Sequence, residues 1–352
     1  MNTPSHPFYN PLILWYINHK RELPWRKTKD PYKIWLSEIM LQQTRVAQGL
    51  PYYLKFVEAF PTVFDLAAAS EQQVLKLWQG LGYYSRARNL HATAKKVAQD
   101  YKGVFPQTYK QLLALKGIGD YTASAIASIC YDAPTAVVDG NVYRVLSRVF
   151  GIATPINSTG GIKEFKTLAQ SLLDSNRPGQ YNQAIMEFGA RHCTPQNPDC
   201  ESCIFSKRCL AFLNDQVTDL PVKIRKQKIK KRYFNYVVPI DSKEKTLLNQ
   251  RSEKGIWQQL YEFPLVESNG PVTQDVLREQ PLVYELASNS PEAELTLYNN
   301  EPVVHKLSHQ HIHASFWILT LPDVGQKGIF ATQIKEYPVP VLLERFIEDF
   351  GF

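Results

Sequence analysis

The sequence predicts a two-domain protein, with a mainly helical N-terminal domain followed by a smaller α/β domain. Its 352 residues are more than one hydrophobic core usually serves. Apolar residues recur at helical spacing up to about residue 213, and short β-rich runs follow Lys231. The charge also changes, from 24 Lys and Arg against 15 Asp and Glu in residues 1–213 to 9 against 16 in residues 233–352. We therefore expect domains at 1–213 and 233–352, joined by a basic linker at 214–232.

The composition is that of an ordinary globular protein. Hydrophobic residues make up 44% and charged residues 21% of the chain, which excludes a mainly disordered or collagen-like protein. No run of 18 apolar residues occurs, and the first residues lack a basic segment leading into a cleavage site, so we expect a cytoplasmic protein with no membrane association. The net charge of +7 is compatible with a polyanionic partner.

The expected elements follow the chain in two sets. Helical spacing is clearest in residues 32–50, 71–99, 121–130 and 161–173. Beyond the linker, β-branched and aromatic runs predict strands near residues 233–240, 246–250, 295–300 and 314–321. Because the expected strands all follow the expected helices, the chain should combine a helical domain with a separate strand-containing domain.

Four of the five cysteines lie close together at the end of the helical domain, with the spacing C-x6-C-x2-C-x5-C. They are Cys193, Cys200, Cys203 and Cys209. One tight pair with two outliers differs from the two tight pairs of most zinc ribbons and favours an iron–sulfur cluster, with structural zinc or free thiols as the alternatives. The remaining Cys130 lies in an apolar helical segment and is expected to be a core residue.

Two helix starts in the middle of this domain carry candidate chemistry. The turn LKGIGDY contains Gly117 and Gly119 and opens directly onto a helix, where backbone N–H groups could hold a phosphate; an ordinary helix–helix connection is the alternative. Asp139 precedes Gly140 and Asn141 at the next helix start. It could be only an N-cap, or a carboxylate that stays ionised and stabilises a cation.

These features occur in one order, with Asp139 20 residues after Gly119 and the cysteine loop last. In that order they resemble the helix–hairpin–helix DNA glycosylases of the endonuclease III superfamily, over roughly residues 8–213. The resemblance implies a mainly α helix–hairpin–helix glycosylase domain, a 4Fe-4S cluster in the loop 193–209, and duplex DNA as the partner.

Further segments are similar to the adenine-specific branch of that family. They are LPWR, WLSEIMLQQT, GLGYYSRARNL and NQAIMEFGARHC. Bifunctional members carry a catalytic Lys two residues beyond the second glycine of the hairpin, where this chain has Tyr121. Without an amine to form a Schiff base, strand cleavage by β-elimination is not expected.

The resemblance also implies roles for individual residues. Glu38, with its pKa raised by apolar surroundings, would protonate adenine as a general acid, and Asp139 would stabilise the oxocarbenium-like sugar. Tyr121 and Asn141 would position the reacting groups. The implied adenine pocket consists of Trp25, Arg26 and Glu187. The alternatives are a surface carboxylate for Glu38 or Glu187 and a core position for Trp25.

The same resemblance assigns DNA contacts, because the adenine must leave the duplex to reach such a pocket. The implied DNA-binding residues are Gln42, Thr44, Tyr83, Gly117 and Gly119. Gln42 and Tyr83 would intrude beside the opposite base, with a buried aromatic as the alternative for Tyr83.

The C-terminal block is similar to a NUDIX-like domain through GIWQQLYEFPL, residues 255–265. No clustered glutamates of a NUDIX hydrolase occur, so pyrophosphate hydrolysis is not expected. The loop LSHQHIH implies recognition of 8-oxoguanine by Leu307, Ser308 and His309, with Leu307 replacing the phenylalanine usual in the family. The alternate histidines at 305–313 could instead bind a metal, or simply follow a half-exposed strand.

The expected function is removal of adenine mispaired with 8-oxoguanine or guanine, by a monomeric, monofunctional glycosylase that leaves an abasic site. A DNA-damage-binding protein without turnover is the main alternative, and the presence of both Glu38 and Asp139 favours the enzyme. A bifunctional pyrimidine-lesion lyase is disfavoured by Tyr121.

Overall fold

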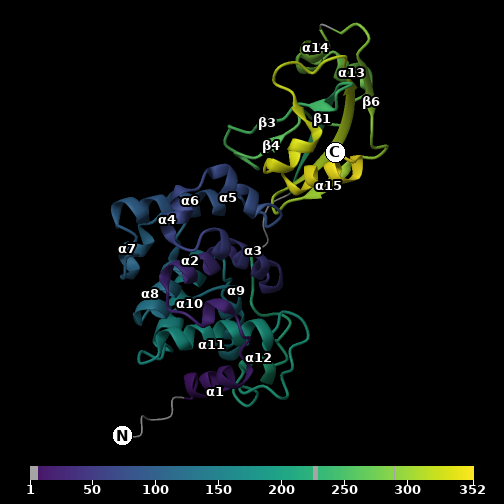
Figure 1. Cartoon of the computed structure of the whole chain (residues 1–352). Helices are drawn as coiled ribbons and strands as arrows, with labels where there is room; N and C mark the ends of the chain where they lie inside the picture. The colour runs from purple at the N-terminus through teal and green to yellow at the C-terminus, as the bar shows by residue number, and fades with distance from the viewer. Residues whose placement is uncertain (1–6, 225–228, 289) are drawn as a thin grey trace. The chain divides into compact units, whose positions relative to one another are not determined.

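A computed structural model describes residues 7–224, 229–288 and 290–352 of the chain (Figure 1). The chain forms two compact units, one of residues 1–68 and 89–225 and the other of residues 69–88 and 226–352. The second unit therefore includes a segment of the region that the sequence assigns to the helical domain. Part of the expected linker, residues 225–228, lies outside the described residues.

The first unit is helical, as predicted. Its elements are α1 (Tyr9–His19), η1 (Pro24–Arg26), α2 (Pro31–Met40), α3 (Val46–Ala59), α4 (Val63–Ala68), most of α6 (Ser85–Asp100), α7 (Tyr109–Leu113), α8 (Asp120–Tyr131), α9 (Gly140–Phe150), α10 (Thr159–Ser171), α11 (Pro178–Arg191) and α12 (Leu210–Leu213). The periodic segment 32–50 is divided by a turn between α2 and α3, in which Gln43 has a φ of 56°.

The helices around α8 form the core of this unit. Residues Thr122 to Ile129 of α8 are buried on all sides of the helix, and α8 packs against α2, α7 and α11. Helix α11 also packs against α1 and α9. These contacts hold α2, α8, α9 and α11 together in one packed group of helices (Figure 1).

The second unit combines α5 (Glu71–Trp78) and the start of α6 with the C-terminal residues. Its strands are β1 (Lys230–Ile240), β2 (Lys245–Thr246), β3 (Asn249–Gln250), β4 (Tyr261–Glu262), β5 (Leu265–Ser268), β6 (Glu294–Leu297), β7 (Val303–Lys306), β8 (Gln310–Thr320) and β9 (Ile329–Phe330). Its other helices are α13 (Gln274–Arg278), α14 (Pro281–Ala287), η2 (Ala331–Glu336) and α15 (Val341–Phe350).

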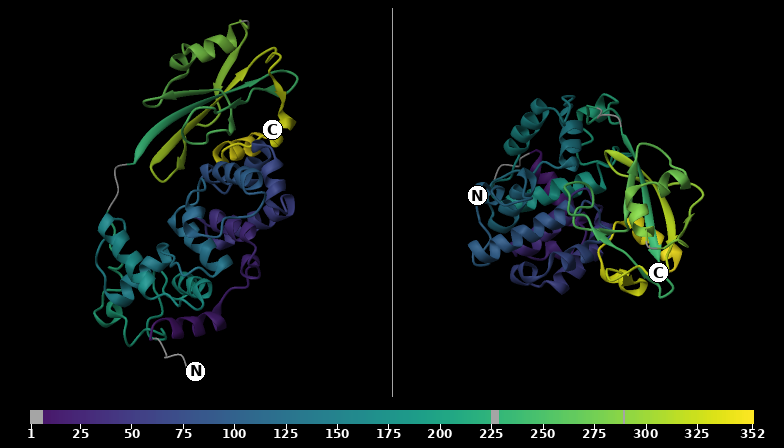
Figure 2. Two further views of the ribbon diagram at one scale, coloured as in Figure 1. Left: turned by 90° about the vertical axis from the view of Figure 1, so that its left-hand side faces the viewer. Right: turned by 90° about the horizontal axis from the view of Figure 1, so that it is seen from above.

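The main sheet of the second unit has the order β5-β1-β8-β6, with β7 also paired to β8. The long strands β1 and β8 are parallel, with Tyr233 opposite His313, and they are the long neighbouring strands in Figure 2. One buried cluster of this unit packs strand residues against α13 and α14. It comprises Val237, Leu277, Val283, Leu295, Trp317, Leu319 and Leu321. The predicted α/β C-terminal domain is confirmed.

None of the described helices has the length and apolar character needed to cross a membrane.

Candidate active site

Glu38 lies on α2, which begins at Pro31 after the N-cap Asp30, whose carboxylate accepts a hydrogen bond from the Tyr32 N–H at 3.0 Å. The side chain points into the helical core, and the residue is only 8% exposed. Burial raises the pKa of Glu38 to about 7, and the nearby charge of Asp139 acts in the same direction. Tyr121 opposes this shift by donating its hydroxyl to Glu38 Oε2 at 2.6 Å. Glu38 is therefore not a solvated surface carboxylate.

Asp139 is the N-cap of α9, is half-buried, and lies close enough to Glu38 for the two carboxyl groups to interact electrostatically. Its Oδ1 accepts the backbone N–H groups of Asn141 and Val142 at 2.9 and 2.8 Å, and its Oδ2 accepts the Asn141 side-chain amide at 2.8 Å. Burial raises the pKa of Asp139 above its ordinary value, and these three donors lower it in part. Asp139 therefore differs from the expected carboxylate that simply stays ionised, because burial acts against ionisation and the N–H donors act in favour of it.

Asn141 connects Asp139 to the cysteine loop. Its Oδ1 accepts a hydrogen bond from Arg144 at 2.9 Å, and the same guanidinium donates to the carbonyls of Gly189 and Cys193. A Cβ at Gly189 would lie 2.9 Å from the Asn141 carbonyl oxygen, so α11 can approach α9 this closely only with glycine there. The sequence singled out neither Arg144 nor Gly189, although a glycine inside a helix is a signal of close packing.

Glu187 on α11 is held by two arginines. Arg26 donates to both carboxylate oxygens at 3.0 and 2.7 Å, and Arg21 does so at 2.8 and 2.5 Å. Although burial alone would raise it, these bonds hold the pKa of Glu187 at about 2. Its side chain has no exposed surface, which excludes the alternative of a helix-surface charge. The sequence missed Arg21, because nothing local marks a partner 166 residues away.

Trp25 is 6% exposed and packs edge-on against the ring of Tyr53, with centroids 4.9 Å apart. This is the core position weighed as its alternative, next to Arg26 in η1. Gln42 and Thr44 lie in the turn after α2, and the amide of Gln42 donates to Thr122 Oγ1 at the start of α8, at 3.2 Å.

The hairpin glycines occupy the connection between α7 and α8. Gly117 has a φ of 78°, and a Cβ there would lie 2.7 Å from the Asn89 Cβ, so this position requires glycine. Gly119 is the N-cap of α8, makes no side-chain cap and has open space where a Cβ would be. Only the first glycine is therefore required by the fold of the turn.

The four clustered cysteines, Cys193, Cys200, Cys203 and Cys209, form no disulfide bonds and line one small cavity between α11 and α12. Arg148, which is 3% exposed, reaches this cavity with Nη1 3.5 Å from Cys193 Sγ and also donates to the carbonyls of Thr194 and Pro195. Among residues 7–224, 229–288 and 290–352, no set of three or more His, Cys, Asp or Glu side chains is arranged to hold a single metal ion. Cys130, in contrast, lies in α8.

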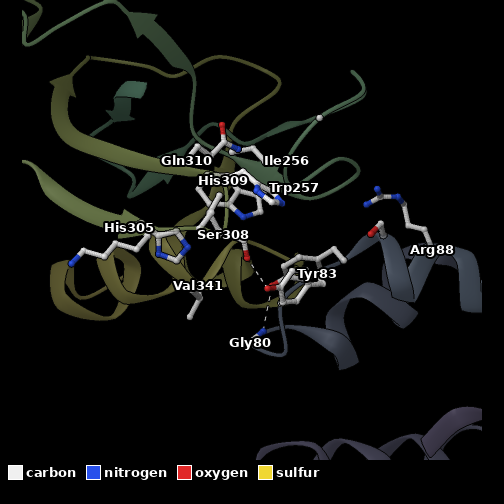
Figure 3. A pocket seen from close by; sticks show the side chains of 16 residues that line it. Gly80, Tyr83, Arg88, Ile256, Trp257, His305, Ser308, His309, Gln310 and Val341 are labelled. Carbon is white, nitrogen blue, oxygen red and sulfur yellow. Dashed lines mark hydrogen bonds between the residues drawn. The ribbon is translucent and has the colours of Figure 1, made fainter. Parts of the chain in front are cut away.

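Within the second unit, Tyr83 and Ser308 come together (Figure 3). Their hydroxyl oxygens are 2.8 Å apart, at the wall of a cavity of about 430 Å³ that Leu307 and His309 also line. Tyr83 is 45% exposed and has a φ of 49°, so it is not a buried core aromatic. Of the alternate histidines, His305 packs against the Trp257 ring and His313 stacks on Tyr233.

Comparison with known proteins agrees with this arrangement. Residues 36–167 match the HhH-GPD superfamily of base excision DNA repair proteins, and residues 235–349 match the NUDIX domain. The chain is 34% identical over 330 residues to the adenine DNA glycosylase of Buchnera aphidicola subsp. Baizongia pistaciae, covering 93% of this chain and 89% of the relative.

Two solved structures are similar to the helical part. A thermostable thymine-DNA glycosylase matches with a TM-score of 0.55 and 31% identity, covering 59% of this chain and 95% of the other. Endonuclease III in a non-covalent DNA complex matches with a TM-score of 0.52 and 20% identity, covering 59% and 94%, which shows a common fold. Together with the two domain matches, these relationships show that the chain belongs to the adenine DNA glycosylase family.

Proposed function

We propose that this protein hydrolyses the N-glycosidic bond of adenine mispaired with 8-oxoguanine or guanine in duplex DNA, acting as a monomer. The proposal rests on two carboxyl groups, the buried Glu38 and the half-buried Asp139, which lie in different environments and interact electrostatically. Glu38 has a pKa of about 7 and a single hydroxyl donor, whereas Asp139 accepts three N–H donors. Paired carboxyl groups with divergent environments are the usual basis of separate acid and charge-stabilising roles.

The chemistry requires both states at once. Breaking the bond leaves electrons on adenine and positive charge on the sugar, so the protonated form of Glu38 would donate its proton to the base. The N–H donors around Asp139 favour its ionised form, which would face the oxocarbenium-like sugar before water attacks. Tyr121 and Asn141 are bonded to Glu38 and Asp139 respectively, and we assign them to positioning.

The expected reaction stops at an abasic site. The residue at the position of the catalytic lysine of bifunctional enzymes is Tyr121, whose hydroxyl bonds to Glu38 and lies 3.2 Å from the Met186 sulfur. A phenol cannot form a Schiff base with the sugar.

We assign recognition of adenine to Arg26 and Glu187, with Arg26 as the contacting residue and Glu187 as the residue that positions it. Because two arginines occupy both oxygens of Glu187, that carboxylate serves mainly to fix Arg26. The charge of Arg26 acts on Glu38, which supports a place for Arg26 at the pocket, and Trp25 supports it from the core.

We assign reading of the opposite base to Tyr83, Ser308 and His309, with Leu307 as the apolar contact. The cavity beside the Tyr83–Ser308 pair offers hydroxyl and imidazole groups on an otherwise apolar wall, which suits a planar base with polar edges. Gln42 and Thr44, in the turn between α2 and α3, and the hairpin glycines would contact the target duplex.

The four cysteines fit a 4Fe-4S cluster. They share one cavity, and the buried cation of Arg148 faces them with Nη1 3.5 Å from Cys193 Sγ. A bound cluster would fix the loop between α11 and α12, to which Arg144 links Asn141.

The proposed function is tested with duplexes carrying adenine opposite 8-oxoguanine, adenine opposite guanine, or thymine glycol. We expect adenine release from the first two and strand breaks only after alkali. Glu38→Gln and Asp139→Asn should bind these duplexes without releasing adenine. Nicking without alkali, or a preference for thymine glycol, would contradict the proposal. Duplex binding without release by the wild type would favour a damage-binding protein instead.

A further inference from the structure

A three-membered polar cluster lies beside the hairpin, outside the site described above. Asp120 Oδ1 accepts a hydrogen bond from the Tyr109 hydroxyl at 2.5 Å and an ion-pair contact from Lys166 Nζ, also at 2.5 Å. Lys166 closes the triangle, because its Nζ lies 3.3 Å from the Tyr109 hydroxyl and 5.3 Å from the centre of the Tyr109 ring.

The cluster joins the two helices of the hairpin at their starts. Tyr109 is the first residue of α7 and Asp120 is the first residue of α8, with the Gly117 turn between these helices. Lys166 comes from a third element, α10. The three side chains therefore fix the start of α8 relative to α7 and add a cation from outside the hairpin.

The charge of Asp120 poses a problem for a phosphate-binding turn. A carboxylate in the first turn of a helix is favourable for the helix itself, because it lies near the positive end of the helix dipole. The same carboxylate, half-exposed here, would repel a phosphodiester that approaches the first N–H groups of α8, which have no side-chain cap. An ammonium group in contact with Asp120 removes most of this repulsion.

We propose that Lys166 is a positioning residue for duplex binding, which neutralises Asp120 and thereby allows the hairpin to accept a DNA phosphate. This inference rests on the proposed function, namely that the hairpin contacts duplex DNA. Lys166 raises affinity through Asp120 and Tyr109, and it does not take part in the chemistry of adenine release.

The test compares three variants with the wild-type full-length protein in binding a duplex with adenine opposite 8-oxoguanine at fixed low salt. Lys166→Met leaves Asp120 unpaired and should raise Kd about five- to tenfold, the scale of two unit charges about 4 Å apart in a water-like dielectric. Asp120→Asn should bind as tightly as wild type or tighter. The double variant, which has neither charge, should recover to within about twofold of wild type.

The matched control is Lys29→Met. Lys29 pairs with Asp132 at 2.8 Å near the other end of α8, and both side chains are about two-thirds exposed. This variant removes one Lys–Asp pair and one positive charge from the same unit, and it should change Kd less than twofold. The single-turnover rate of adenine release at saturating enzyme should stay at the wild-type value in all these variants, because the hydrogen bonds of Lys166 go to Tyr109 and Asp120 and not to Glu38, Tyr121 or Asp139.

Two results would overturn the inference. If the double variant remains as weak as Lys166→Met, Lys166 contacts the phosphate itself; if Lys166→Met binds like Lys29→Met, the cluster has no role in binding. A Lys166→Met protein with a lowered melting temperature is checked by Lys166→Arg, which keeps the charge and should restore Kd. Failure of the proposed function is distinguishable, since the wild type would then release no adenine from this duplex, whereas the inference is judged only from the Kd values of the variants relative to wild type.

Discussion

The raised pKa of Glu38 predicts an unusual pH dependence of stability. Glu38 is 8% exposed, and its pKa rises from 4.5 in the unfolded chain to about 7 in the folded protein. An acid whose pKa is raised by folding binds more protons in the folded state, so it destabilises the folded protein progressively as pH rises from 4.5 to 7. The full penalty above pH 7 is about 3 kcal/mol, because each pKa unit corresponds to about 1.4 kcal/mol.

Glu38→Gln should remove this penalty. Relative to wild type, the free energy of unfolding of the variant should rise by about 2 kcal/mol between pH 5.5 and pH 8.5, where most of the titration occurs. Comparing the two pH values cancels any constant cost of repacking the amide beside Tyr121. The measurement is urea-induced unfolding, followed by circular dichroism, of both proteins at each pH.

Glu187→Gln provides the matched control. The pKa of Glu187 is depressed to about 2, so its stabilising contribution is complete above pH 4.5 and is lost only as pH falls toward 2. Glu187→Gln should therefore be destabilising by the same amount at pH 5.5 and 8.5. A pH-independent effect of Glu38→Gln, or a stability difference that shrinks as pH rises, would refute the reasoning.

Three further predictions follow from contacts at the site. Gly189→Ala places a Cβ 2.9 Å from the Asn141 carbonyl and should cost about 1–3 kcal/mol of stability and most adenine release, whereas Gly160→Ala, with open space around its Cβ, should cost neither; thermal melting and product assays check this. Tyr83→Phe removes the hydrogen bond to Ser308 and should reduce the preference for 8-oxoguanine over guanine about threefold to tenfold in competition assays, with no further loss on adding Ser308→Ala. Arg21→Met leaves Glu187 with one arginine and should lower the free energy of unfolding by about 1–3 kcal/mol, as measured by urea unfolding. A free energy of unfolding equal to that of wild type would contradict joint stabilisation of Glu187 by the two arginines.

The parts of the site that local sequence specifies could be predicted. Asp139 as an N-cap follows from its place before a helix start, and the cysteine group follows from its spacing. The apolar stretch around Glu38 indicates burial and therefore a raised pKa. In each case the determining neighbours lie within a few residues along the chain.

The parts of the site that depend on packing between distant segments could not be predicted from the sequence. Arg21 contacts Glu187 across 166 residues, and Tyr83 meets Ser308 across 225. The grouping of residues 69–88 with the C-terminal unit likewise has no local signal, because helix α5 has the same amphipathic pattern as its neighbours. The short strands β2, β3 and β4 are set by pairing with distant partners more than by their own residues.

If a protonated Glu38 donates the proton that releases adenine, the single-turnover rate of adenine release must follow the titration of Glu38. With enzyme in excess over a duplex carrying adenine opposite 8-oxoguanine, the wild-type rate should fall about tenfold per pH unit above pH 7, as Glu38 with its pKa of about 7 loses its proton, and should fall again at low pH as Asp139 is protonated. A rate that rises through pH 7, or a Glu38→Gln variant that keeps the wild-type rate, would contradict the account.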